Sequence, residues 1–149
     1  MGSYTQILYQ IVFSTKYRAR VLVNPNRQEL FNYIAGILKE KNCHAYQING
    51  VEDHLHILIR LHPSVTLSGL VKDIKLATNK FIKEKRLFPL FNGWQVGYGA
   101  FTYSVERRKT LIEYIKRQEE HHRVQTFPEE YRKLLDDQEV EYDEKYIFE

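Results

Sequence analysis

The sequence has little of several residue types that mark special classes of protein. Its 149 residues include one cysteine, Cys43, so no disulfide can form within the chain and no zinc site can use several thiolates. Four prolines and seven glycines are too few for a linker or a low-complexity protein. No apolar run approaches the ~18 residues that cross a membrane, and residues 1–10 lack a secretory signal pattern. These absences predict a globular, cytoplasmic protein without a membrane partner.

Charge is abundant and unevenly distributed along the chain. Residues 127–149 carry nine acidic and three basic side chains, a net charge of −6. Residues 1–126 carry ten acidic and nineteen basic side chains, a net charge of +9. We therefore divide the chain into a basic domain, 1–126, and an acidic C-terminal tail, 127–149. A basic body is typical of a protein that binds a polyanion, and an ordinary solvated basic surface has the same composition.

Hydrophobic periodicity predicts seven elements before the tail. They are strands at 5–15, 44–50, 54–60 and 97–104, and helices at about 25–41, 68–86 and 105–122. The expected helix caps are Asn24, Ser68 and Ser104. The tail is expected to hold a short helix at 131–135 and an extended segment at 142–148. The first six elements follow the split β-α-β pattern of the ferredoxin-like (RRM-like) fold, of class α+β. Its antiparallel sheet would carry helices on one face and leave the other face free.

Two histidines in the predicted strand 54–60 are candidate metal ligands. His54 and His56 flank Leu55, so their imidazoles project side by side while Leu55 points into the core. Two such imidazoles can bind one divalent metal ion. By spacing alone, two histidines on a solvated sheet face are the simpler interpretation. The preceding Asp53, the apolar character of the strand and the basic and aromatic groups elsewhere favour the metal.

A metal held by two histidines needs further ligands, and the third predicted helix offers them. Tyr114 and Gln118 are four residues apart, so they lie on one helix face one turn apart. Gln118 could give its side-chain oxygen to the metal and keep Tyr114 near whatever the metal binds. The ordinary alternative is a packed tyrosine and a solvated glutamine. His121 and His122 lie on nearly the same face and are alternative ligands to Gln118.

Several segments together resemble a known family. His54-Leu55-His56 resembles the histidine–hydrophobic–histidine motif of the HUH endonuclease superfamily. Segments 13–18, 94–98 and 114–118 resemble the first strand, the stretch before the last strand and the tyrosine helix of its single-tyrosine transposases. These belong to the insertion sequence 200/605 group and include domesticated REP-associated relatives. The resemblance covers about residues 4–122.

The resemblance implies a metal-dependent transposase that cleaves and rejoins single-stranded DNA through a 5′-phosphotyrosine intermediate. In it, Tyr114 would be the nucleophile, and His54, His56 and Gln118 would hold Mg²⁺ or Mn²⁺. Imidazole ligands suit manganese better than magnesium, which prefers oxygen. The resemblance also implies hairpin-containing element ends as the substrate and a homodimer, with each site built from one chain or from two.

Seven basic side chains are candidate phosphate contacts, although each could equally be a solvated surface charge. They are Lys16, Arg18, Arg20, Lys72, Lys75, Lys80 and Lys83. The strongest alternative function is a non-catalytic module that binds single-stranded nucleic acid with the same basic and aromatic groups. A replication initiator or relaxase is a second alternative, but those proteins are usually longer. Only the enzyme requires His54, His56 and Tyr114 to converge.

Overall fold

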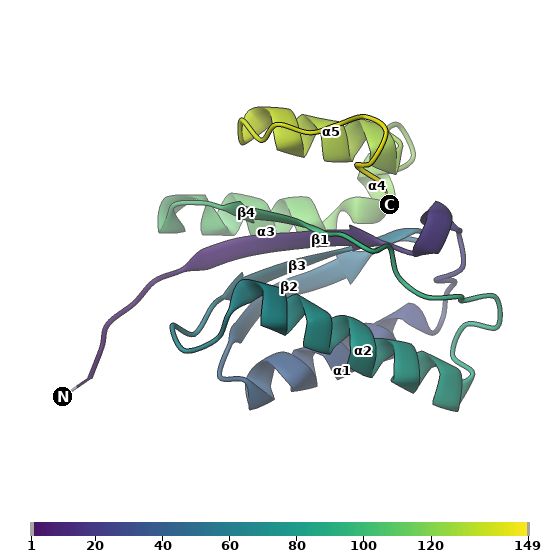
Figure 1. Cartoon of the computed structure of the whole chain (residues 1–149), viewed down its shortest axis with the longest axis horizontal. Coiled ribbons are helices and arrows are strands. Elements are labelled where there is room, and N and C mark those ends of the chain that lie inside the picture. The colour runs from purple at the N-terminus through teal and green to yellow at the C-terminus, as the bar shows by residue number, and fades with distance from the viewer. Residues whose placement is uncertain (1, 149) are drawn as a thin grey trace.

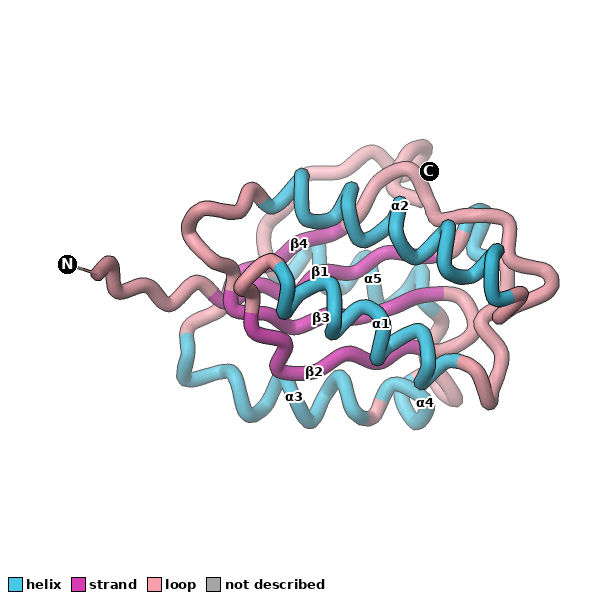
Figure 2. Tube along the Cα trace, turned by 90° about the horizontal axis from the view of Figure 1, so that it is seen from below, coloured by secondary structure: helices cyan, strands magenta, loops and turns pink. Residues whose placement is uncertain are grey.

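The structure is a computed structural model that describes residues 2–148 (Figure 1). Its elements are β1 (Leu8–Ser14), η1 (Lys16–Arg18), α1 (Arg27–Glu40), β2 (His44–Gly50), β3 (His54–Arg60), α2 (Leu67–Lys85), β4 (Gly99–Thr102), η2 (Val105–Arg107), α3 (Arg108–Lys116), α4 (Gln118–His121) and α5 (Phe127–Asp137). The strands form one antiparallel sheet in the order β2-β3-β1-β4, which Figure 2 shows from the side of α1 and α2. The predicted ferredoxin-like α+β fold is confirmed. Within residues 2–148, no helix is both long enough and apolar enough to cross a bilayer.

Alternating side chains on β1 and β3 give the sheet two different faces. Ile11 and Phe13 on β1 and Leu55 and Ile57 on β3 point to one face, and all four are fully buried. Helices α1 and α2 cover this face, as Figure 1 shows below the sheet. Their apolar residues, such as Ile34, join the strand residues in the largest hydrophobic cluster of the described chain. Burial of this apolar surface is the main favourable term in folding.

The opposite face of the sheet is also covered, so the expectation of a free face is wrong. Helix α5 lies over β1 and β4, and α3 lies toward β2 and β3 (Figures 1 and 2). Two small apolar clusters anchor these helices: Val12, Phe101, Phe127, Tyr131 and Leu135 under α5, and Leu8, Leu58, Leu111 and Ile115 under α3. The acidic tail covers part of the face because it contains α5, an amphipathic helix whose apolar side needs a partner, and α3 of the preceding domain covers the rest.

The sheet is shaped to receive α5. A Cβ atom at Gly99 of β4 would lie 2.7 Å from Cε1 of Tyr131, so the absence of a side chain there lets the tyrosine ring pack on the strand. Thr126 caps the helix, because its hydroxyl oxygen accepts a hydrogen bond from the backbone N–H of Glu129 at 3.3 Å. Helix α5 is longer than the expected 131–135, and residues 144–148 form turns rather than the expected extended segment.

Three predicted helix starts differ from the structure. Asn24 is not a cap, because residues 24–26 form a turn and α1 begins at Arg27. Thr66, not Ser68, caps α2, and its Oγ1 accepts from the N–H of Gly69 at 3.2 Å. Ser104 makes no side-chain cap hydrogen bond and precedes the short helix η2. Thr66 is the better cap because α2 already begins at Leu67.

The predicted helix 105–122 is divided in the structure into η2, α3 and α4. The break between α3 and α4 falls at Arg117. Asn49 of β2 donates from its Nδ2 to the carbonyl oxygens of Ile115 and Lys116, at 2.9 and 3.1 Å. These bonds satisfy carbonyl groups in the last turn of α3, where the helix itself supplies no partner. The chain can therefore turn before Gln118 and bring α4 against the sheet.

Candidate metal centre and tyrosine site

His54 and His56 lie on the covered second face of the sheet, and both are fully buried. They come from β3, where Leu55 between them points to the opposite core as the alternation predicts. Phe127 at the start of α5 stacks on the His54 ring, with ring centroids 4.2 Å apart. The pair is therefore enclosed between the sheet and the C-terminal helices rather than exposed to solvent.

The Nδ1 atom of each histidine ring is hydrogen-bonded to an acceptor. Nδ1 of His54 lies 2.7 Å from Oδ1 of Asp53, and Nδ1 of His56 lies 2.7 Å from Oε1 of Gln10. An ionised carboxylate and an amide oxygen can only accept, so both Nδ1 atoms carry the hydrogen. In a neutral imidazole, Nε2 then bears the lone pair that binds a metal. Asp53 and Gln10 thus orient both rings as partners of metal-ligating histidines usually do.

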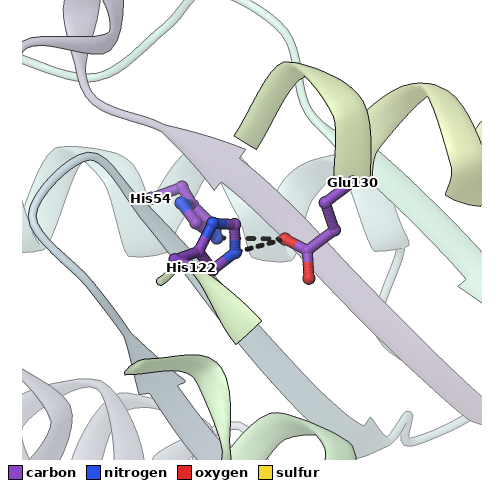
Figure 3. A group of neighbouring side chains, drawn as sticks. All are labelled: His54, His122 and Glu130. Carbon is purple, nitrogen blue, oxygen red and sulfur yellow. Dashed lines mark hydrogen bonds and ion pairs between the residues drawn. The ribbon is translucent and has the colours of Figure 1, made fainter. Parts of the chain in front are cut away.

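The Nε2 atoms converge on one carboxylate, that of Glu130 from α5. Its Oε1 lies 3.1 Å from Nε2 of His54, 3.0 Å from Nε2 of His56 and 3.0 Å from Nε2 of His122. Figure 3 shows His54 and His122 approaching Glu130 from the same side. Potential ligand atoms of His54, His122 and Glu130 all lie within 4.8 Å of one another, so this group could hold a metal ion.

Tyr114 and Gln118 meet the histidines at the same carboxylate. Gln118 is fully buried, its Oε1 lies 3.2 Å from Nε2 of His54, and its Nε2 donates to Oε2 of Glu130 at 3.2 Å. The hydroxyl of Tyr114 also donates to Oε2 of Glu130. Its ring centroid lies 6.0 Å from that of His56. All four residues that the resemblance singled out are thus brought together within a single chain.

The neighbouring histidines His121 and His122 have different surroundings. His122 reaches the cluster through Glu130 and its ring lies 4.5 Å from that of His54. His121 instead packs against Tyr114, with ring centroids 4.6 Å apart, and its buried Nε2 has no hydrogen-bond partner among the described residues. Of the two alternatives to Gln118, the geometry therefore favours His122, which lies beside Gln118 rather than replacing it.

Burial and close contacts set the charges of this cluster. Burial opposes a charge on His54, but hydrogen bonds to Asp53 and Glu130 raise its pKa to about 9. Burial lowers the pKa of His56. Burial alone would raise the pKa of Glu130, but the surrounding imidazoles hold it well below its usual range. Burial and the charge of Glu130 raise the pKa of Tyr114, so its hydroxyl stays protonated at neutral pH.

Comparisons with known proteins agree with this architecture. The family model described as "Transposase IS200 like" matches residues 3–118, which is most of the chain. The chain belongs to the IS200-like transposase family. A relative of this transposase, the ISDra2 transposase TnpA of Deinococcus radiodurans, is 26% identical over 126 residues, covering 78% of this chain and 87% of the relative. The family and this relative assign the chain to DNA transposition by an insertion-sequence type of transposase.

Two solved structures share the fold of this transposase. A protein from Deinococcus radiodurans R1 that is described as a transposase superposes with a TM-score of 0.62 and 24% identity, covering 79% of this chain and 95% of that one. A REP-associated tyrosine transposase bound to a REP hairpin superposes with a TM-score of 0.60 and 16% identity, covering 82% of this chain and 74% of that one. At such identities the likeness shows the fold alone.

Two clefts of the transposase reach the buried cluster. One, of about 530 Å³, lies between α3 and α5 and is lined by Tyr114 and Glu130, with Arg107 and Lys133 among its other residues. The second, of about 440 Å³, includes Asp53 and His122 in its lining. Arg20 and Arg123 also line this second cleft. Basic side chains thus stand at both approaches to the site, as binding of a phosphate polymer requires.

The predicted phosphate contacts fall into two separate regions of the transposase. Lys16, Arg18 and Arg20 follow β1, and Arg20 lies at the second cleft. Lys72, Lys75, Lys80 and Lys83 are on α2, across the sheet from the histidines (Figure 1). Lys75 is engaged within the fold, because its Nζ donates to the carbonyl oxygens of Gln95 and Gly97 at 2.8 and 2.7 Å. The structure therefore brings Arg20, and not the α2 lysines, to a cleft beside the site.

Sequence reasoning missed Glu130, Gln10 and the basic residues Arg107, Arg123 and Lys133. A signal for Glu130 was present, since it occupies a position of the apolar stripe formed by Phe127, Tyr131 and Leu134. A carboxylate on the apolar stripe of a helix calls for a buried partner. Gln10 also had a signal, as a polar residue on an otherwise apolar strand and on the same face as the histidines.

Proposed function

We propose that this transposase cleaves and rejoins single-stranded DNA in a metal-dependent reaction, with Tyr114 as the nucleophile and a 5′-phosphotyrosine intermediate. One observation carries the proposal. The Tyr114 hydroxyl and the Nε2 atoms of His54 and His56 all contact the same carboxylate group. A module that only binds nucleic acid has no need of this convergence, which costs the fold several buried polar groups.

The proposed metal ligands are His54, His56 and Gln118, and the proposed ion is Mg²⁺ or Mn²⁺. The donor set fits a divalent ion, because both Nδ1 atoms are occupied by acceptors and both Nε2 atoms face the same point. Imidazole donors favour Mn²⁺ over Mg²⁺. A bound ion would neutralise a phosphate oxygen and so ease nucleophilic attack at phosphorus.

Tyr114 would supply the covalent step. Its hydroxyl oxygen forms a bond to phosphorus, the bond from phosphorus to the 3′ oxygen breaks, and the released 3′ oxygen takes up a proton. The phenol proton passes to the Glu130 carboxylate, the acceptor that the hydroxyl already contacts. The phosphotyrosine keeps the energy of the broken phosphodiester, so rejoining needs no nucleotide cofactor.

The proposed substrate is single-stranded DNA with a hairpin near the element end. A structural neighbour is bound to a REP hairpin, and the clefts beside Tyr114 and His122 carry Arg107, Lys133, Arg20 and Arg123. Lys16 and Arg18 extend this basic surface.

We also propose a cytoplasmic homodimer, because the sheet ends in edge strands that can pair with those of a second copy. Light scattering should then give a mass of twice 17.9 kDa.

The test is formation of a covalent protein–DNA adduct. The substrate is a set of suicide single-stranded oligonucleotides, with their hairpins, taken from the DNA that flanks the gene, and Mn²⁺ is supplied. The wild type should give an adduct on a denaturing gel, and Tyr114→Phe should give none because the attacking oxygen is gone. The phenyl ring remains, so Tyr114→Phe should still fold and bind the same oligonucleotides in a gel-shift assay.

Tyr103→Phe is the matched control. Tyr103 also lies on the second face and has a bonded hydroxyl, which accepts a hydrogen bond from Nε2 of Gln10 at 3.0 Å. Its adduct should persist. An adduct that survives in Tyr114→Phe would move the nucleophile elsewhere. A wild type that binds the oligonucleotides but never forms an adduct would instead favour the module that only binds single strands.

A further inference from the structure

The buried cluster contains two groups that lie outside the family match. That match ends at residue 118, whereas His122 follows α4 and Glu130 belongs to α5. Glu130 is 1% exposed, and its Oε1 has three imidazole Nε2 atoms within 3.1 Å. The segment that the sequence presents as an acidic tail thus places one carboxylate at the centre of the histidine cluster.

The contacts of this carboxylate require positive charge, which protons on the imidazoles or a metal ion can supply. Asp53 and Gln10 occupy the Nδ1 side of His54 and His56, so each Nε2 faces the Glu130 carboxylate. A neutral imidazole, which burial favours for His56, would set its Nε2 lone pair against the carboxylate lone pairs, which is repulsive. One metal ion bound by these atoms relieves all of these contacts at once, since imidazole nitrogen and carboxylate oxygen are both ordinary ligands of divalent metals.

The spacing of the donor atoms fits a shared ion for His54, His122 and Glu130, whose ligand atoms all lie within 4.8 Å of one another. Ligand atoms at about 2.1 Å from one ion in octahedral geometry lie about 3.0 Å from their neighbours. Oε1 of Glu130 lies 3.0 to 3.1 Å from the Nε2 atoms of His54, His56 and His122. Oε1 of Gln118 lies 3.2 Å from Nε2 of His54, which extends the same spacing.

The position of Glu130 is fixed by the packing of α5. Phe127 stacks on the ring of His54, and Tyr131 fills the space left by Gly99. These two residues flank Glu130 on the buried side of the helix, so the carboxylate is directed into the cluster whenever α5 is docked. The contact of Glu130 with the histidines is therefore a feature of the fold, because the packing of Phe127 and Tyr131 fixes it.

We propose that Glu130 and His122 are ligands of the metal ion of this transposase, in addition to the histidine pair and Gln118. The metal then links α5 to the sheet, and the C-terminal segment completes the metal centre. This inference rests on the metal site of the proposed function and goes beyond the ligand set that the resemblance implies.

Metal affinity and helix protection test the proposal together. Isothermal titration of the full chain with Mn²⁺ should give an affinity at least ~10-fold weaker in Glu130→Gln, which keeps the shape of the side chain and removes its charge. His122→Ala should also bind Mn²⁺ more weakly. Hydrogen exchange followed by mass spectrometry should show that Mn²⁺ slows exchange at the α5 amides of the wild type and has little effect in Glu130→Gln.

The controls are neighbours of the two proposed ligands. Glu129→Gln makes the same change at an exposed position of α5, and His121→Ala removes the histidine that faces Tyr114 instead. Both should bind Mn²⁺ as the wild type does. Circular dichroism of each variant without metal confirms that it is folded before the affinities are compared.

The possible outcomes separate this inference from the proposed function. Unchanged Mn²⁺ affinity in Glu130→Gln, with weakened binding in His54→Ala, overturns the role of Glu130 and keeps the metal site. Tighter Mn²⁺ binding in Glu130→Gln, together with faster exchange of α5 on metal addition, would mean that the carboxylate competes with the metal and also overturns the proposal. A wild type that binds no Mn²⁺ removes the metal from the proposed function itself.

Discussion

The two faces of the sheet are built from the same strands but differ in what they bury. The face toward α1 and α2 buries aliphatic and aromatic side chains such as Ile57 and Phe13 in one continuous cluster. The face toward α3 and α5 divides its apolar residues into two small clusters, and between them it buries His54, His56 and Glu130. One face therefore supplies most of the stability, and the other positions reactive groups at some cost in stability.

This division shows how a small chain can hold a buried polar site and still keep a continuous apolar core. Period-two alternation on β3 sends Leu55 and Ile57 to one side and His54 and His56 to the other, so each strand serves both purposes. The polar face is closed by helices that follow the last strand of the ferredoxin-like core.

The largest expected effect is the loss of stability from a cavity in the face toward α1 and α2. Ile57→Ala should reduce the free energy of unfolding by about 2–5 kcal/mol, because Ile57 is fully buried in the continuous cluster. Leu58→Ala, the next residue along β3, should cost less, because α3 can shift to close the gap under its small cluster. Urea denaturation of both variants measures the difference.

Adduct formation should rank these two variants in the opposite order to their loss of stability. A shift of α3 in Leu58→Ala moves Tyr114, so adduct formation should fall more in Leu58→Ala than in Ile57→Ala at a temperature where both are folded. A larger stability loss in Leu58→Ala, or equal adduct yields, would mean that the two faces do not divide stability and function in this way.

Much of the first face could be predicted from sequence, because its signals are local. Strands β2 and β3 begin and end where the sequence predicts, since alternation, β-branched residues and the turn at 51–53 agree. The direction of Leu55 into the core followed from the same alternation. Helix starts were less accurate, because Asn24 and Ser68 are plausible caps close to the true starts of α1 and α2.

The second face was predicted in part, because its contacts join distant segments. The convergence of Tyr114 and Gln118 with the histidines was expected from the resemblance and from their helical spacing, and the structure brings them together. The role of the tail was not expected, since the resemblance covers only about residues 4–122 and implies nothing about residues 127–149. Net charge averages over both sides of α5 and hides the apolar side on which Glu130 lies.

A smaller effect is expected where α5 meets the sheet. Gly99→Ala places a methyl group in contact with the Tyr131 ring and should cost about 1–3 kcal/mol of stability through overpacking. Because Tyr131 follows Glu130, the same change should loosen the carboxylate and speed hydrogen exchange in α5. Gly36→Ala is the control, since nothing lies within 4 Å of its new methyl group. In the middle of α1 it should stabilise the protein by about 0.5–1 kcal/mol.

If Gly99→Ala leaves α5 exchange unchanged, then the helix does not depend on this contact and the second face is more rigid than the packing implies. Faster exchange in both glycine variants would instead point to a general loss of stability, because Gly36 is on α1, across the sheet from α5 (Figure 1).

The smallest expected effect concerns the one lysine of α2 that is drawn into the fold. Nζ of Lys75 donates to the backbone carbonyls of Gln95, Val96 and Gly97, at 2.8, 3.2 and 2.7 Å, and so holds the loop before β4. Burial lowers the pKa of Lys75 to about 8, below the ~10.4 of an unfolded chain. Between these two values the unfolded chain binds more protons, so this group makes the folded state more stable as the pH rises.

Lys75→Met should abolish that contribution. Thermal unfolding between pH 7.5 and 10 should show the wild type gaining stability relative to Lys75→Met as the pH rises, while Lys72→Met corrects for the loss of one positive charge from the same helix. A difference between wild type and Lys75→Met that shrinks with rising pH would mean that the three carbonyls hold the charged amine more strongly than burial disfavours it. In that case Lys75 is a stabilising charge at the edge of the face toward α1 and α2. Both faces would then hold stabilising polar groups, and they would differ only in where those groups lie.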